Sequence, residues 1–163
     1  MSAQEAVYSA SLAGVVVGET AISDVQGEEG LLSYRGINID ELVDVPFLHV
    51  VWLVLFGDWP NTREKNQLVA FMTQHSRLSF GEIALLQNIS RDLHPMLMLQ
   101  GLMPLLELPG EESMGLGLDA EHGLVLAAKI PALVAAHYRL GQSKAPMPPI
   151  PGKKFHENFL YMF

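Results

Sequence analysis

Two helix-capping patterns in the middle of the sequence restrict what this chain can fold into. At 61–64 and again at 79–82, Asn or Ser is followed three residues later by Glu. In such a box, the short side chain accepts a hydrogen bond from a free backbone amide of the first turn, and Glu accepts from the amide of the capping residue. Apolar residues at helical spacing follow the second box. The boxes predict helices over 62–75 and from residue 80 onward.

Three further segments favour helix. Residues 47–56 are apolar nearly all round, which predicts a buried helix ending at a glycine, and Pro60 lies just beyond. A helix over 96–108 should kink or break at Pro104. A long helix capped by Asp119 should run to about residue 140 and contains an internal proline.

The first part of the chain has a different texture. Residues 15–23 are rich in β-branched side chains, residues 24–30 are rich in turn formers, and residues 31–36 are again suited to a strand. This order predicts a small β-hairpin. A short helix is expected over 39–43.

We therefore expect two parts, with a mainly α fold overall. Residues 1–46 would form the N-terminal segment with the hairpin and short helix, and residues 47–163 a helical portion. The final residues 159–163 are all apolar, as though a helix were cut in its first turns, so we expect this portion to be incomplete at its C-terminal end. The alternative is a terminal helix that docks onto the rest.

Composition excludes several classes of protein. Hydrophobic residues make up 49% of the chain and charged residues 17%, which excludes disorder. The net charge of -8 and the scattered basic residues argue against a nucleic-acid partner. The longest apolar run, residues 50–56, is far shorter than a membrane span. The absence of Cys fits a reducing compartment, and we expect a cytoplasmic protein.

A search for chemistry finds no site. The six His lack the spacing of a helical zinc motif, and nucleophile, P-loop and dinucleotide patterns are missing. The pairs Glu28–Glu29 and Glu111–Glu112 fall in loops, where solvated turns are the expected role. We therefore assign no catalytic, cofactor-binding or metal-binding residue.

Several segments together resemble the citrate synthase family. They are GVVVGETAISDV at 14–25 with LSYRG at 32–36 and IDEL at 39–42, FGDWPN at 56–61, HPM at 94–96, AAKIP at 127–131 with AAHYR at 135–139, and NFLYM at 158–162. Asn61 stands where the family usually has Thr. Each motif alone is weak, but their order and gaps match the front part of a family member.

This resemblance implies the N-terminal part of the citrate synthase large domain, with its small N-terminal β-hairpin, and a two-fold homodimer. The family condenses acetyl-CoA or a related acyl-CoA with oxaloacetate and uses no metal or tightly bound cofactor. Its Asp, His and Arg residues remove a proton, stabilise the enol and hold carboxylates. These residues belong to motifs beyond the last one matched, so none is carried onto a position here, and we expect the chain to be inactive alone.

The resemblance also gives the Met- and Leu-rich segment after residue 93 a role. In the family, the His-Pro-Met motif lies in a helix at the subunit interface, where adaptable apolar side chains are suitable. The candidate dimer-interface residues are His94, Met96, Leu97, Leu99, Leu102 and Met103.

Other interpretations stay open. The chain could be a non-catalytic protein that dimerises or binds a full-length relative. It could also be one subunit of a split citrate synthase whose complementary chain carries the catalytic residues.

Overall fold

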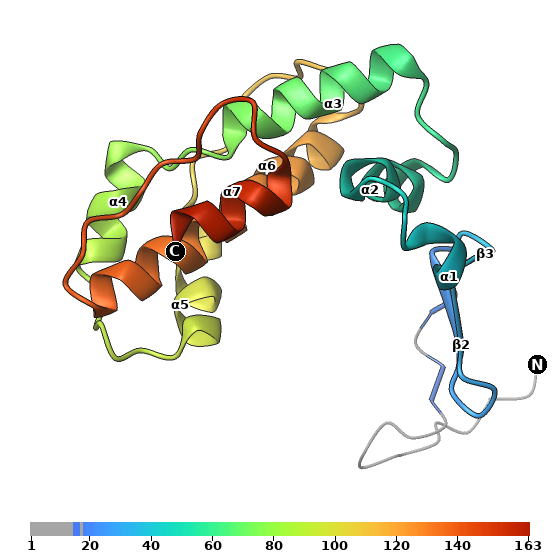
Figure 1. Cartoon of the computed structure of the whole chain (residues 1–163), viewed down its shortest axis with the longest axis horizontal. Coiled ribbons are helices and arrows are strands. Elements are labelled where there is room, and N and C mark those ends of the chain that lie inside the picture. The colour runs from blue at the N-terminus through green and yellow to red at the C-terminus, as the bar shows by residue number, and fades with distance from the viewer. Residues whose placement is uncertain (1–14, 17) are drawn as a thin grey trace, which may run out of the picture. The chain divides into compact units, whose positions relative to one another are not determined.

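The computed structural model describes residues 15–16 and 18–163, and Figure 1 shows the order of their helices and strands. Residues 1–14 and Val17, which belongs to the expected first strand, lie outside the described residues. Contacts divide the chain between Val45 and Pro46. The two units are described separately.

The first unit contains a three-stranded antiparallel sheet in the order β1-β2-β3. Its strands are β1 Ser23–Gln26, β2 Leu31–Tyr34 and β3 Ile37–Asn38. The expected start of the first strand is wrong, because among the described residues it begins at Ser23, which pairs with Tyr34. Residues 24–26, which the sequence pattern places in the loop, are part of β1.

The turn between β2 and β3 consists of Arg35 and Gly36, which both have positive φ angles of 51° and 80°. Two such residues give the backbone twist that matches tightly connected antiparallel strands. The short helix α1 Ile39–Leu42 follows at once, as predicted. The Asn38 side chain caps it by accepting from the amide of Asp40 at 2.9 Å.

The second unit is entirely helical among its regular elements. The elements are α2 Phe47–Phe56, α3 Thr62–His75, α4 Phe80–Gln87, α5 Pro95–Leu102, the 3₁₀ turn Met103–Leu105, α6 Leu118–Gly141 and α7 Phe155–Met162. Both predicted capping boxes are present, at Asn61 with Glu64 and at Ser79 with Glu82. Gly57 ends α2 in the left-handed conformation.

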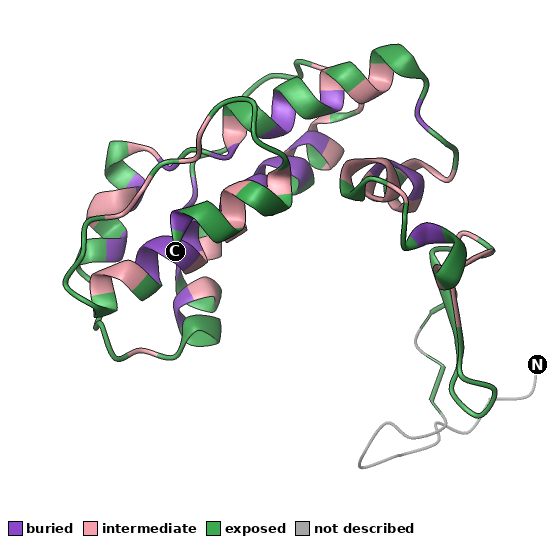
Figure 2. Cartoon of the chain, viewed as in Figure 1, coloured by how far each residue is buried: buried purple, intermediate pink, exposed green. Residues whose placement is uncertain are grey.

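Helix α6 is the centre of this unit. It contacts α3, α4, α5 and α7, and Figure 2 shows buried residues running along it. One apolar cluster forms where α5 and α7 meet α6, around Met98, Leu133 and Met162. A second forms between α2, α3 and the first half of α6, around Trp52 and Leu124. These clusters hold the helices together by removing apolar surface from water.

By length and composition α6 could cross a bilayer, but half of the relevant stretch is buried inside this chain. A core helix of a folded unit gives the same pattern. The connector after α6 is fixed by Asn158, whose side chain accepts from the Ile150 amide at 2.8 Å and donates to the Ile150 carbonyl at 2.9 Å.

Two expectations for the helices need correction, and a third is confirmed. Helix α2 is only half-buried, with Phe47 and Leu55 about half exposed, because only one side packs on the second cluster. The expected break near Pro104 is confirmed, because the α-helix ends at Leu102 and a 3₁₀ turn follows, since Pro104 lacks the amide that would continue the helix. Helix α6 starts one residue before Asp119, with Gly117 at the cap position.

Candidate functional site

A buried ion pair joins α4 and α6. Glu82 and Lys129 are 2% and 5% exposed, and the Lys129 ammonium donates to Oε1 of Glu82. Lys129 also donates to the Glu107 carbonyl at 2.9 Å, and the Glu107 amide donates to Oε1 of Glu82 at 3.0 Å. The network therefore joins α4, α6 and the segment that follows the 3₁₀ turn.

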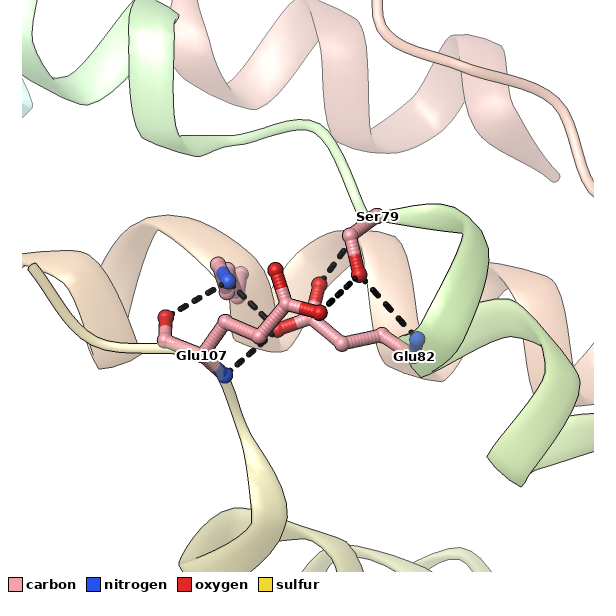
Figure 3. A network of polar contacts seen from close by, with 4 residues as sticks. Ser79, Glu82 and Glu107 are labelled. Atoms are coloured by element: carbon pink, nitrogen blue, oxygen red, sulfur yellow. Dashed lines mark hydrogen bonds and ion pairs between the residues drawn. The ribbon is translucent and has the colours of Figure 1, made fainter.

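Helix capping places the carboxylate of this pair. Glu82 is the third residue of α4, and its Oε2 accepts from the Ser79 amide at 2.8 Å. The Ser79 hydroxyl in turn donates to Glu107 Oε1 at 2.8 Å, as Figure 3 shows. One glutamate thus serves the local cap and the contact with α6.

Burial alone would raise the pKa of Glu82. Donation from Lys129 and from the backbone amides of Ser79 and Glu107 outweighs burial and lowers the pKa below its ordinary value. The carboxylate stays ionised at neutral pH and has no proton to offer. Its two oxygens already accept from three donors of the same chain, so this group stabilises the fold.

A second buried carboxylate, Glu121, holds the loop that precedes α6. It is fully buried. Its Oε2 accepts from the amide and hydroxyl of Ser113 at 2.7 and 3.1 Å, and its Oε1 accepts from the amide of Met114 at 2.7 Å and that of Leu116 at 3.5 Å. Burial tends to raise the pKa of Glu121, but these donors together hold it below its usual value.

The buried or half-buried histidines of α6 also have structural partners. His137 Nε2 donates to the Leu93 carbonyl at 2.8 Å, and His122 Nε2 donates to the Pro109 carbonyl at 2.7 Å. Each ring ties a loop to α6. Across the described residues, every buried side-chain nitrogen or oxygen has a hydrogen-bond partner.

The sequence did not single out Glu82, Lys129 or Glu121 as buried charges. A capping glutamate is normally solvent-exposed, so position three of a helix gave no sign that Glu82 is enclosed. Lys129 offered one available signal, because it is the lone cation in the apolar stretch 124–136. Glu112 is exposed, as expected for a loop carboxylate, and its Oε2 also accepts from the Gly117 amide at 3.3 Å.

The candidate interface residues separate into two groups. His94, Met96 and Leu97 are exposed, with Met96 and Leu97 at 65% and 55%. Leu99 and Met103 are half-buried against the first cluster, and Leu102 is 3% exposed within it. His94 also starts α5, because its Nδ1 accepts from the Met96 amide at 3.2 Å.

The described helices bear no cluster of metal ligands, and one cavity among them is small. Within residues 15–16 and 18–163, no three His, Asp or Glu side chains gather closely enough to hold a metal ion. One cavity of about 160 Å³ is lined by Leu86, Gln87, Ile89, Arg91 and Leu140. Ligand pockets usually have volumes of about 300–1,000 Å³.

Comparison with known proteins shows to which family the chain is related. A family model described as "Citrate synthase, C-terminal domain" matches residues 11–163. The chain belongs to the citrate synthase family. The resemblance inferred from the sequence motifs is therefore confirmed, and so is a mainly α fold with a small sheet.

Curated members of the citrate synthase family match nearly the whole chain. The Citrate/2-methylcitrate synthase of Bacillus subtilis is 32% identical over 158 residues, which cover 95% of this chain and 42% of that protein. The peroxisomal Citrate synthase 1 of Arabidopsis thaliana is 30% identical over 155 residues, covering 88% of this chain and 32% of that protein. The chain spans less than half the length of these relatives.

Solved structures agree in fold. The citrate synthase from Pyrobaculum aerophilum gives a TM-score of 0.82 at 28% identity and covers 93% of this chain and 41% of its own. The citrate synthase from Thermotoga maritima gives 0.80 at 24% identity, with coverage of 96% and 41%. At that identity the second comparison speaks for the fold alone.

Proposed function

We propose that this chain forms the N-terminal scaffold portion of a citrate synthase-type acyltransferase and does not catalyse the condensation by itself. The reaction would be that of an acetyl-CoA or related acyl-CoA with oxaloacetate. Support for the reaction class comes from the family, and support for the scaffold role comes from the described residues. The chain covers about two fifths of relatives that carry citrate synthase names.

The observation that carries the scaffold role is how the buried titratable groups are used. Glu82 pairs with Lys129, Glu121 holds a loop, and His137 binds a backbone carbonyl. General acid–base catalysis needs such a group within hydrogen-bond reach of a substrate. Here these groups face their own chain.

The test is CoA release from acetyl-CoA and oxaloacetate, followed with a thiol reagent, on the purified 163-residue chain. A parallel assay with propionyl-CoA covers the 2-methylcitrate reaction. We expect no release above the rate without protein. Helical circular dichroism and a cooperative urea transition show that the sample is folded. Turnover on the order of 1 per second would refute the proposal.

We also propose that the chain self-associates through the exposed side of α5. Met96 and Leu97 expose large apolar side chains next to each other, and a two-fold interface would bury them against their copies. Light scattering should give about twice the 17.9 kDa monomer mass. The double variant M96E/L97E should be monomeric, whereas V69E, at an exposed position of α3, should remain associated. A wild-type monomer at tens of micromolar would contradict this proposal.

A further inference from the structure

The loop before α6 binds a carboxylate in an unusual way. Four donors from three neighbouring residues, Ser113, Met114 and Leu116, converge on the side chain of Glu121. The backbone amides of Ser113 and Met114, each at 2.7 Å, donate to different oxygens of the carboxylate. Short contacts of this kind are typical of charge-assisted hydrogen bonds.

The backbone shape of the loop produces this convergence. Gly115 and Gly117 have φ angles of 74° and 91°, in the region that favours glycine. Residues on either side of a left-handed residue turn their amides toward one point and create a concavity that binds anions. A Cβ on either glycine would meet no atom within 4 Å, so the demand for glycine comes from the backbone angle and not from space.

We propose that residues 113–116 form an anion-binding nest whose ligand is the chain's own Glu121. The carboxylate, from the first turns of α6, takes the place that a free small carboxylate would occupy. This internal ligand seats Met114 and Leu116 against the second cluster, whose buried members include Trp52 and Leu124. The Glu121 carboxylate therefore satisfies the amides of the loop and helps to hold the loop against α6.

Two neighbouring contacts close the same loop at its ends. His122 donates to the Pro109 carbonyl, and Glu112 accepts from the Gly117 amide. These contacts keep the loop near α6 without filling the nest. A chain that lacks only the Glu121 carboxylate therefore retains a concavity of the right shape, with donors unpaired.

The test is chemical rescue of E121A by formate. Tm is measured with sodium formate and with sodium chloride at matched ionic strength, on wild type, E121A and E111A, which removes an exposed loop carboxylate. We expect E121A to melt about 10 °C below wild type. Formate should restore part of the lost Tm, with an effect that saturates as the formate concentration rises, and chloride should not. Wild type and E111A should respond equally to the two salts.

Equal formate and chloride effects on folded E121A would overturn the proposal. If E121A does not fold, hydrogen exchange on the wild-type chain decides it. The amides of Ser113 and Met114 should exchange at least 100-fold more slowly than free loop amides, on the order expected for stable hydrogen bonds. Exchange at the free-loop rate would show that the carboxylate does not hold the nest, and would overturn the proposal in the same way.

Discussion

Replacing Lys129 by Met tests whether the buried network holds the helical unit together. Methionine has a similar length and apolar character, so it fills much of the volume without a cavity. The change removes the charge partner of Glu82 and the donor to the Glu107 carbonyl. The Glu82 carboxylate keeps the amides of Ser79 and Glu107 but stays 2% exposed without a cation.

The expected loss of unfolding free energy is about 3–5 kcal/mol, the usual cost of breaking a buried pair from one side. At about 2–4 °C per kcal/mol for a chain of this length, Tm should fall by roughly 10 °C. That is a large fraction of the about 5–15 kcal/mol available to a typical domain.

Urea unfolding followed by circular dichroism gives the measurement. The matched control is K144M, at an exposed lysine, which should stay within about 0.5 kcal/mol of wild type. The variant E82Q and the double variant E82Q/K129M complete a cycle, in which we expect a coupling energy of about 2 kcal/mol. A K129M loss no larger than that of K144M, or a coupling energy near zero, would refute the reasoning.

Three other outcomes follow from the structure. Burial lowers the pKa of His75, and hydrogen-bond donors that outweigh burial lower those of Glu82 and Glu121. The unfolded chain therefore binds protons first as pH falls, so the urea midpoint should decrease below about pH 6.5 and more steeply below about pH 4.5. H75Q should flatten the decrease that begins near pH 6.5. A midpoint that rises on acidification would contradict this sign. Gly123→Ala should raise stability by about 0.5–1 kcal/mol, because this exposed helical position has space for a Cβ; a loss in thermal unfolding would count against it. Asn158→Ala should cost about 1–3 kcal/mol and speed proteolysis of the connector, because two backbone groups lose their partner; unchanged cleavage would show that the connector is fixed by other contacts.

Local chemistry explains which elements were predictable. Asn61 and Ser79 predict helix starts because the backbone amides that donate to their side chains lie only three residues away. Gly57 predicts a helix end because helices often end at a residue with a positive φ angle, which glycine adopts readily. In contrast, nothing local marks Gly117 rather than Asp119 as the residue before α6, since Glu121 sets that loop from within the helix.

The charges of the buried network required knowledge of distant contacts. Glu82 and Lys129 are 47 residues apart, and no pattern in the sequence pairs them. The residues of α5 were a different case, because the helical period separates the buried side of this helix from its exposed side. Met98 and Leu102 are four residues apart and share the buried side, whereas Met96 and Leu97 fall outside it. Grouping Leu102 with exposed neighbours overlooked that period.

The double role of Glu82 has a consequence for how this unit folds. The Glu82 side chain caps the first turn of α4 and also forms the ion pair with Lys129 of α6. Secondary structure and tertiary docking at this point are therefore not separate stages. The start of α4 becomes fully stable only when α6 arrives, so these distant parts of the chain should order, and come apart, in one cooperative step.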